Sequence, residues 1–391
     1  MKQQTLKSIF IFISVAYTTP LWGQKNIARE WYYKAETEIL FSNYTAAHEY
    51  LDKALAINKN FAEAFFLKGK TYFLQKKYDL AKQQFEISIQ KNPQSYESYA
   101  YLGTIFFEQQ SYEEAIIFFN KALAINPQYA VVYNYRAEAF KELGLTRQAI
   151  LDYNKAIALE PKEAILYFGR AKCKMSLQDY QGAVQDLDQA IALEPKNSLF
   201  IQYRTEARFL SGDFIATAQD IDQLIAQNPE IVEKYHYKLN LFCKIYQKDY
   251  QGAIQALNYL IKEDSTQIEL LLERAKYHFL LRDFFHAAQD YVRAIFLNPD
   301  NAQNYYDCAL VYKEAKEFEK AYQYFTSAII TDSSHAQSWY ERGLIQLKLK
   351  RKKEARKDLL QAYRKGITLE KMQPEAQALI RKEILPVQKH K

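Results

Sequence analysis

Apolar residues in this chain recur at the three- and four-residue spacing of amphipathic helices. The stretch SYESYAYLGTIFFEQQSYEEAIIFFNKALAINPQ (residues 95–128) shows the pattern twice, with a short turn at QQS between the two halves. The first helix is expected to carry on one face Tyr99, Leu102, Gly103 and Phe106. The second is expected to turn inward Ala115, Phe119 and Ala122. Pro127 ends the second helix, because proline cannot continue the hydrogen-bond ladder. The stretch therefore predicts two antiparallel helices.

This two-helix pattern repeats every 34 residues. The same alanine recurs at Ala47, Ala81, Ala115, Ala149, Ala183, Ala253, Ala287, Ala321 and Ala355. An aromatic residue stands three positions earlier in most copies, and a proline twelve positions later in six of them. The series departs from alanine at Thr217 and then gains two residues, so we expect a local distortion or hinge near 228–236. One helix pair cannot bury its apolar face alone, so neighbouring pairs must stack.

These marks resemble the tetratricopeptide repeat family over roughly residues 28–366. The resemblance implies an all-α fold, a right-handed superhelical solenoid of about ten helix-turn-helix repeats, irregular near 228–236. Repeats 1 to 10 would start near residues 28, 62, 96, 130, 164, 198, 234, 268, 302 and 336. Residues 367–391 would form a C-terminal capping helix and a basic tail.

Five repeats carry an arginine at their seventh position and an aspartate sixteen residues later. The pairs are Arg136 with Asp152, Arg170 with Asp186, Arg204 with Asp220, Arg274 with Asp290, and Arg342 with Asp358. The other five repeats carry neither residue, which predicts a salt bridge between the two helices of one repeat. Exposed pairs contribute only ~0.2–1 kcal/mol each, but fork-to-carboxylate geometry would fix the angle between the helices. A ligand clamp made of these arginines is the alternative.

The N-terminus predicts export. Lys2 and Lys7 precede the apolar stretch SIFIFISVAY, and small Gly23 comes before Gln24, as in a signal peptide over residues 1–23. The apolar stretch is shorter than the ~20 residues that span a bilayer, although a retained anchor is the alternative. We expect an exported, periplasmic or extracellular protein with no transmembrane span after signal cleavage.

Charge is concentrated near the C-terminus. The chain has a net charge of +6, and from Leu347 onward 14 Lys and Arg stand against 5 Asp and Glu. The run KLKRKKEARK (residues 348–357) predicts a solvated helix face, or contact with an anionic envelope surface, an acidic partner or another copy of the chain. The export signal and the lack of interleaved aromatics argue against nucleic acid.

The sequence contains few motifs that would indicate catalysis, cofactor binding or metal binding. Glycine-rich phosphate loops, G-x-S-x-G and Cys-x-x-Cys are missing from it. The three cysteines, Cys173, Cys243 and Cys308, predict buried thiols without a disulfide framework. The six histidines lack ligand spacing, and His278 and His286 stand eight residues apart on either side of a turn. We therefore expect no catalytic residue, no cofactor and no metal.

Binding residues are expected where the family resemblance places the concave face, at positions two, five, nine, twelve and thirteen of each repeat. Large apolar residues at the fifth position are Tyr32, Phe66, Phe168, Leu272, Tyr306 and Tyr340. At the ninth position they are Phe242, Leu310 and Leu344. Repeats 9 and 10 thus supply a four-residue cluster beside Leu347. A partner segment could bind this cluster, or the terminal helix or another copy of the chain could cover it.

The resulting expectation is a non-enzymatic scaffold in the cell envelope that binds a protein or peptide segment in a concave groove. One alternative is a periplasmic assembly factor or holdase for unfolded or envelope proteins. Another is an enzyme, or an enzyme subunit, that acts on envelope polymers.

Overall fold

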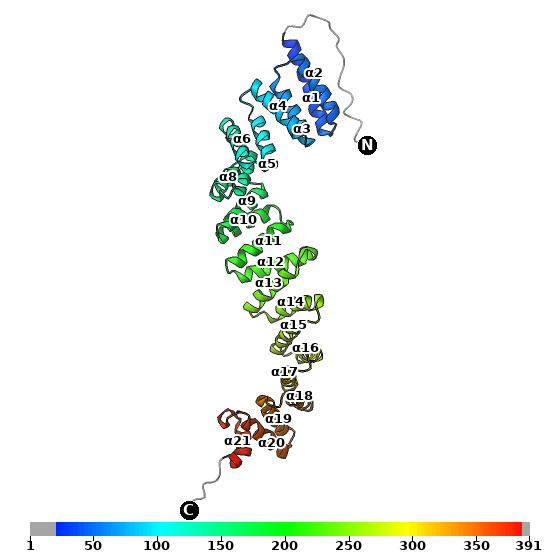
Figure 1. Cartoon of the computed structure of the whole chain (residues 1–391), viewed down its shortest axis with the longest axis vertical. Helices are drawn as coiled ribbons and strands as arrows, with labels where there is room; N and C mark the ends of the chain where they lie inside the picture. The colour runs from blue at the N-terminus through cyan, green and yellow to red at the C-terminus, as the bar shows by residue number, and fades with distance from the viewer. Residues whose placement is uncertain (1–20, 385–391) are drawn as a thin grey trace, which may run out of the picture. The chain divides into compact units, whose positions relative to one another are not determined.

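The computed structural model describes residues 21–384, and these residues are helical with no strand. They form twenty-one α-helices and two short 3-10 helices, which confirms the predicted all-α repeat fold (Figure 1). The chain divides into two compact units, Met1–Pro195 and Lys196–Lys391, and each is described by itself. The predicted signal peptide lies almost entirely outside the described residues.

Unit 1 contains five helix pairs, one per predicted repeat. The helices are α1 (Leu21–Leu40), α2 (Tyr44–Ile57), α3 (Ala62–Leu74), α4 (Tyr78–Lys91), α5 (Tyr96–Glu108), α6 (Tyr112–Ile125), α7 (Ala130–Glu142), α8 (Thr146–Leu159), α9 (Ala164–Ser176) and α10 (Tyr180–Leu193).

Unit 2 contains five further pairs and a terminal helix. Its first pairs are α11 (Ser198–Leu210), α12 (Phe214–Gln227), α13 (Lys234–Tyr246), α14 (Tyr250–Glu263), α15 (Ile268–Leu280) and α16 (Phe284–Leu297). The remainder are α17 (Ala302–Glu314), α18 (Phe318–Thr331), α19 (Ala336–Lys348), α20 (Lys352–Arg364) and α21 (Pro374–Ile384). The two 3-10 helices are η1 (Pro229–Ile231) and η2 (Leu369–Lys371). The two-residue excess near 228–236 is therefore taken up by η1, between α12 and α13.

Small residues set the spacing of each pair. All nine alanines of the 34-residue series are fully buried, as is Thr217, whose Oγ1 donates to the Asp213 carbonyl at 2.7 Å. Gly103 has no room for a side chain, because a Cβ there would lie 2.5 Å from the Phe119 ring. The departure at Thr217 is thus absorbed locally, without breaking α12.

The turn inside every repeat contains one left-handed residue at the fifteenth position. Glycine occupies it in two repeats, at Gly144 and Gly212. The other eight turns use Ser42, Lys76, Gln110, Gln178, Lys248, Arg282, Lys316 and Lys350, with φ between 57° and 63°. The next residue caps the second helix with its side chain in Asn43, Asp179, Asp213, Asp249 and Asp283.

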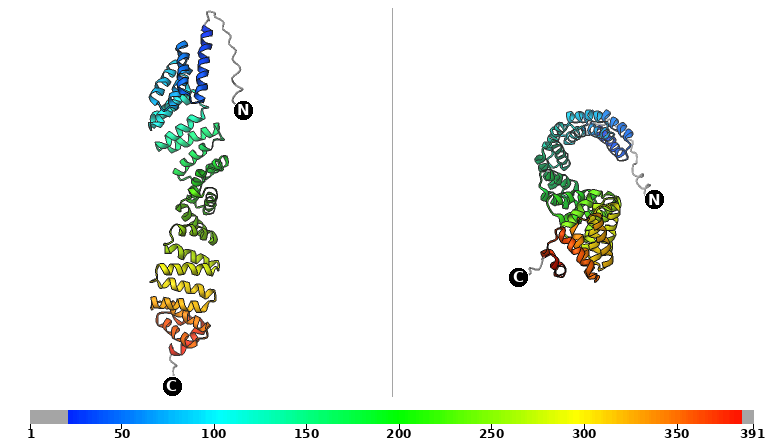
Figure 2. Two further views of the ribbon diagram at one scale, coloured as in Figure 1. Left: turned by 90° about the vertical axis from the view of Figure 1, so that its right-hand side faces the viewer. Right: turned by 60° about the horizontal axis from the view of Figure 1, so that its bottom comes forward.

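In unit 1 the first helices of successive repeats also contact one another. These contacts join α1 to α3, α3 to α5, α5 to α7 and α7 to α9. The pairs from α1 to α10 follow an arc with the first helices inside (Figure 2, right). The inner face of unit 1 is therefore built from α1, α3, α5, α7 and α9.

The C-terminal segment closes the last repeat of unit 2. Helix α21 packs on α20 and buries Ala376 and Ile380 completely. No described helix combines the length and the apolarity that crossing a membrane requires.

Candidate functional site

An open groove lined by aromatic side chains lies on the inner face of unit 1, where α5 meets α7 and the end of α3. We call it the aromatic groove, and its principal lining residues are Phe73, Tyr101, Thr104, Tyr129, Val131 and Tyr135. Its volume is about 180 Å³. Since about 150 Å³ accommodates a benzene-sized group, the groove has room for one aromatic or branched aliphatic side chain.

Ring stacking fixes the walls of the aromatic groove. The Tyr101 ring lies 5.2 Å from Phe73, 5.6 Å from Phe66 and 5.3 Å from Phe85, measured between centroids. Such edge-on and offset contacts contribute about 0.5–1.5 kcal/mol each beyond burial. Aromatic rings held in this way offer a rigid apolar surface to a ligand, with little entropy left to lose on binding.

The polar atoms of the aromatic groove are neutral. Burial, followed by Tyr101 and Glu97, raises the pKa of Tyr129 to about 12, and burial also raises the pKa of Tyr101. Thr104 Oγ1 donates to the Ala100 carbonyl at 3.1 Å. Val131 remains 44% exposed at the opening. The groove thus offers apolar contact and neutral hydrogen-bonding hydroxyls.

Three residues predicted from the sequence as groove residues lie in unit 1, and none of them lines the aromatic groove itself. Phe66 supports its wall through Tyr101 and Phe85. Phe168 is buried, with Lys172 Nζ 4.8 Å from its ring centroid. Tyr32 packs against the buried cluster of repeats 1 and 2 that contains Leu51 and Phe61, and its hydroxyl donates to Glu36 Oε1 at 3.2 Å.

Four more predicted residues lie in unit 2, and two of them, Tyr306 and Leu310, pack against one core cluster. Phe242 is exposed beside Phe214, with ring centroids 5.2 Å apart. Leu272 packs against the core of repeats 8 and 9, and Leu310 against that of repeats 9 and 10. Tyr306 lies between Phe325 and His335, and burial followed by Glu341 raises the pKa of Tyr306 to about 12.

The last two predicted residues are covered by the chain itself. Leu344 is 8% exposed and belongs to one cluster with Met372, Ala376 and Ile380. The backbone N–H of Gln373 donates to Tyr340 Oη at 2.9 Å. The alternative of cover by the terminal helix therefore describes Tyr340 and Leu344, and Leu344 is not free to meet a partner in this structure.

The five arginines lie against the aspartates with which the sequence pairs them. In each pair Nε donates to Oδ2 and Nη2 to Oδ1, with N···O distances of 2.5–3.0 Å. All five aspartates are buried. The figure for exposed pairs therefore does not apply here. Removing one partner of a buried pair leaves an uncompensated buried charge, which costs about 3–5 kcal/mol.

Most of these Arg–Asp ion pairs, which we call the arginine ties, include a third residue that was not predicted from the sequence. Nη1 of Arg136, Arg170 and Arg274 donates to an asparagine sixteen residues earlier, Asn120, Asn154 and Asn258 respectively, at 2.6–2.7 Å. Nη1 of Arg342 similarly donates to Thr326 Oγ1 at 3.2 Å. Each of these arginines thus connects the second helix of its own repeat to that of the repeat before. The sixteen-residue spacing on both sides of the arginine was the available signal.

The aromatic groove was also missed, for a different reason. Phe73, Thr104 and Val131 occupy concave positions, but Tyr101 and Tyr135 occupy the sixth position, one residue past the fifth. The recurrence of tyrosine at that position in consecutive repeats could have pointed to it.

The three cysteines are buried and free, as the sequence predicts. Burial raises the pKa of Cys173 and of Cys243 to about 11, so both thiols are protonated and unreactive at neutral pH.

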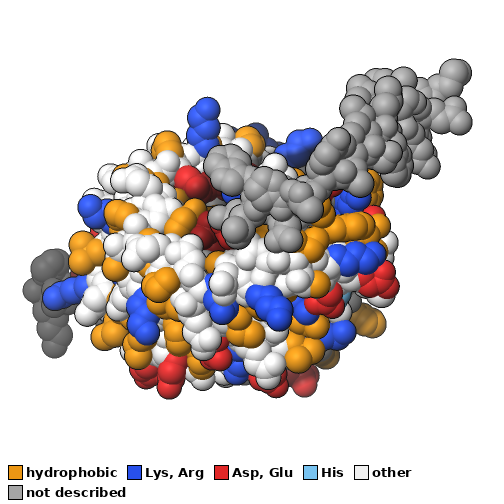
Figure 3. Space-filling view, turned by 90° about the horizontal axis from the view of Figure 1, so that it is seen from above, with side chains coloured by type: hydrophobic (Ala, Val, Ile, Leu, Met, Phe, Trp, Pro, Cys, Tyr) orange, Lys and Arg blue, Asp and Glu red, His pale blue; other side chains and the backbone are white. Residues whose placement is uncertain are grey.

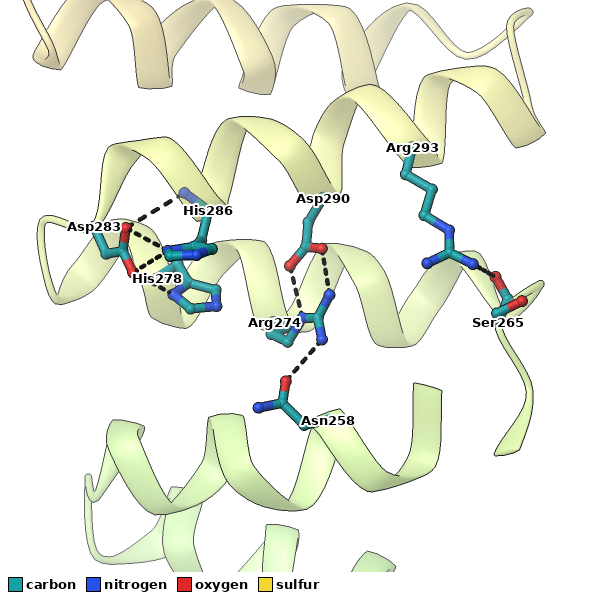
Figure 4. A network of polar contacts seen from close by, with 8 residues as sticks. All are labelled: Asn258, Ser265, Arg274, His278, Asp283, His286, Asp290 and Arg293. Atoms are coloured by element: carbon teal, nitrogen blue, oxygen red, sulfur yellow. Dashed lines mark hydrogen bonds and ion pairs between the residues drawn. The ribbon is translucent and has the colours of Figure 1, made fainter. Parts of the chain in front are cut away.

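His278, Asp283 and His286 meet at the turn between α15 and α16, next to the Arg274–Asp290 tie (Figure 4). The histidine spacing in the sequence predicts no metal ligands here. The turn nevertheless brings one ligand atom from each residue within 4.8 Å of the others. Burial lowers the pKa of His278, despite the opposing effects of Asp283 and Asp290.

One face of the molecule carries charged side chains of both signs. On the face shown in Figure 3, Lys and Arg side chains alternate with Asp and Glu side chains and with hydrophobic ones. A partner for such a face needs mixed rather than uniformly charged chemistry.

Comparison with known families agrees with the fold. Models of the tetratricopeptide repeat match residues 63–95, 136–198 and 306–368, and a model described as TPR repeat matches residues 103–144. A DnaJ protein P58IPK homolog from Arabidopsis thaliana is 32% identical over 75 residues, which are 18% of this chain and 16% of that protein. The matches support the tetratricopeptide repeat family for this chain.

Two solved structures are among those similar to this chain. PilF of Pseudomonas aeruginosa is 18% identical at a TM-score of 0.48, over 53% of this chain and 95% of that one. A tetratricopeptide repeat protein from Parabacteroides merdae is 20% identical at a TM-score of 0.41, over 64% of this chain and 98% of that one.

Proposed function

We propose that this chain, a series of tetratricopeptide-type helix pairs, is a non-enzymatic binding scaffold that holds a protein or peptide segment in the aromatic groove of unit 1. The observation that carries the proposal is a preformed apolar groove on the inner face, walled by stacked rings and open at Val131. Rigid aromatic side chains in a pocket are the usual anchors of protein interfaces.

The groove also specifies the partner. A cavity of about 180 Å³ takes one large apolar side chain. The hydroxyls of Tyr101, Tyr129 and Thr104 lie within the same lining, where they can hydrogen-bond a peptide backbone. We therefore propose an extended segment with one aromatic or branched aliphatic anchor, rather than an acidic peptide or a nucleic acid.

Site-specific photo-cross-linking tests this assignment. A photoreactive amino acid replaces Val131 in the groove or, as the matched control, Ile117 on α6, which is 52% exposed. In the native cell, position 131 should cross-link a defined partner that position 117 does not. A further Tyr101→Asp change, which adds charge to the groove wall, should abolish the product at 131.

Equal products at positions 131 and 117 would contradict the groove assignment. So would an undiminished product at 131 in a Tyr101→Asp chain whose circular dichroism shows intact helices. Purified partner should bind the Val131→Glu chain at least tenfold more weakly than the Ile117→Glu chain.

We also propose that the scaffold works in the cell envelope. The support is the predicted signal at residues 1–23, with its basic start and apolar stretch. Cell fractionation followed by N-terminal sequencing tests it, and the mature chain should begin near Gln24. An intact Met1 in the cytosolic fraction would contradict export.

A holdase for unfolded chains is the second candidate, and a second surface favours it. An apolar groove of about 530 Å³ runs along α16 to α17 and α18 in unit 2. Its lining includes Phe285, 68% exposed, and Phe296, 84% exposed. Exposed phenylalanines of this kind are typical of surfaces that bind other proteins.

Suppression of aggregation separates the two candidates. A holdase should keep several unrelated unfolded proteins soluble, and Phe285→Ser with Phe296→Ser should remove that effect. A scaffold with a defined partner should fail with most clients, and the α16 changes should leave the cross-link at position 131 intact.

A further inference from the structure

The turn of repeat 8 differs from the equivalent turns of the neighbouring repeats. At positions eleven and sixteen, repeats 5, 6 and 7 carry Lys174 with Asp179, Arg208 with Asp213, and Lys244 with Asp249. In repeat 7, Lys244 Nζ lies 3.3 Å from Asp249 Oδ2. Repeat 8 keeps the aspartate but replaces the cation with His278, and it adds His286 at position nineteen, where repeats 5 and 7 have glycine.

These substitutions put two imidazoles on one carboxylate. His278 Nδ1 lies 3.0 Å from Asp283 Oδ2, and His286 Nδ1 lies 2.8 Å from the same oxygen. The two rings are stacked, with centroids 5.2 Å apart. Figure 4 shows His278 from the end of α15 and His286 from the first turn of α16 converging on Asp283.

We propose that His278, Asp283 and His286 bind one divalent transition-metal ion, such as Zn²⁺. Two imidazole nitrogens and one carboxylate oxygen are ligands that these ions prefer, whereas Mg²⁺ and Ca²⁺ prefer oxygen alone. In a tetrahedral site, ligand atoms 2.0–2.1 Å from the ion are about 3.3–3.4 Å apart. The two N···O separations are 3.0 and 2.8 Å, so the side chains need to move apart by only a few tenths of an ångström to admit an ion.

The surroundings hold the ligands in place. Asp283 is fixed as the helix cap, since it accepts a hydrogen bond from the His286 N–H at 3.3 Å. The guanidinium of Arg274, on the same helix as His278, is engaged by Asp290 and Asn258. His286 is 56% exposed, which leaves an entry path and open coordination positions on the solvent side.

A bound ion would connect the end of α15 to the start of α16 across the left-handed residue Arg282. It would therefore act as a clasp on this turn. The open coordination positions would admit water or a ligand atom from a binding partner. The site lies in unit 2 and is distinct from the aromatic groove of unit 1.

Metal titration of the full chain, purified without a polyhistidine tag, tests the proposal. Isothermal calorimetry with Zn²⁺ should give one ion per chain, and Co²⁺ should give a visible absorption band at the same stoichiometry. His278→Lys, which restores the arrangement of repeat 7, and His286→Gln should each weaken binding at least tenfold, in line with the ~10–100-fold cost of disturbing even outer-sphere partners.

The matched control uses the cap aspartates. Asp283→Asn keeps a capping oxygen but removes the carboxylate, so it should weaken Zn²⁺ binding while the helical signal is retained. Asp249→Asn makes the same change in repeat 7 and should leave Zn²⁺ binding unchanged. Zn²⁺ should also raise the melting temperature of the parent chain and of the Asp249→Asn chain only.

The proposal is overturned if the parent chain shows no saturable binding at one ion per chain. It is also overturned if the His278→Lys and His286→Gln chains bind Zn²⁺ with unchanged affinity, because the ion would then lie elsewhere.

Discussion

The ninth position of the repeat, a predicted concave position, meets different surroundings in repeat 3, where it is Thr104, and in repeat 10, where it is Leu344. In repeat 3, Tyr101 and Thr104 line an open groove of about 180 Å³. In repeat 10, Tyr340 and Leu344 lie under the C-terminal segment, and Leu344 forms one cluster with Met372 and Ile380. Repeat 3 is followed by another repeat, whose helix α7 contributes Val131 and Tyr135 to the groove lining, whereas repeat 10 is followed by a single helix that packs on it.

The comparison shows that a position in the repeat determines which way a side chain points, and the neighbouring element determines whether it is exposed. The stacked rings around Tyr101 keep the open groove rigid although no other described element packs over it. On the covered face, aliphatic Leu344 packs against Met372, Ala376 and Ile380, and aromatic Tyr340 packs against the same cluster.

Removing the cover should have the largest effect. A chain that ends at Gly366 loses Met372 and Ile380, which are both buried. At about 1.5–3 kcal/mol for each large buried side chain, repeat 10 should lose about 3–6 kcal/mol of local stability. Hydrogen exchange of the α19 and α20 amides measures this loss directly.

Point substitutions provide the control for that truncation. Ile380→Ala should reproduce part of the loss, about 2–5 kcal/mol, while exposed Arg381→Ala should stay within about 0.5 kcal/mol. Unchanged protection of α19 in the truncated chain would show that α21 does not cover this face.

The arginine ties should be equally strong in both regions, although the inner faces differ. Arg136→Ala beside repeat 3 and Arg342→Ala in repeat 10 each leave a buried aspartate unpaired, at a cost of about 3–5 kcal/mol. Arg170→Ala should cost less, because Lys174 Nζ stays 2.8 Å from Asp186 Oδ2. Urea denaturation of the three chains measures the differences.

A double-mutant cycle supplies the control. Arg136→Ala and Asp152→Ala together should cost less than the sum of the two single changes, because the second change removes the unpaired charge. Additive costs would contradict the ties as bidentate, buried pairs.

The sequence predicted the repeat fold, the two helices of each repeat and the five ties, because all of them follow from local periodicity and a fixed sixteen-residue offset. For Tyr340 and Leu344 it left cover by the terminal helix as one alternative beside partner binding, and it did not predict the open groove at repeat 3. Whether Leu344 is exposed depends on where residues 369–384 fold back, and that is a long-range contact without a period. The histidine cluster was missed for a related reason, since His278 and His286 meet only after the turn reverses the chain.

Two alanine substitutions, one on each face, sharpen the contrast between the covered face and the open groove. Leu344→Ala under the cover should cost about 2–5 kcal/mol, while Val131→Ala at the mouth of the aromatic groove should cost within about 0.5 kcal/mol. Denaturation midpoints of the two chains provide the measurement. A large loss for Val131→Ala would mean that the groove is packed shut rather than open.

Substitutions of the left-handed turn residue should have the smallest effect on stability. The effect should be the same in both regions, because every repeat has this turn whether or not its inner face is covered. Gln110 in repeat 3 has φ 61° and Lys350 in repeat 10 has φ 63°. A left-handed conformation costs a non-glycine residue about 1–2 kcal/mol, and glycine loses about 0.5–1 kcal/mol of that gain through backbone entropy. Gln110→Gly and Lys350→Gly should therefore each stabilise the chain by about 0.5–1 kcal/mol in thermal denaturation.

The reverse change, Gly144→Ala in repeat 4, should destabilise by about 1 kcal/mol through φ alone, because a Cβ there would touch nothing within 4 Å. A gain confined to one of the two glycine substitutions would mean that the cover over repeat 10, or its lack over repeat 3, also strains the turn.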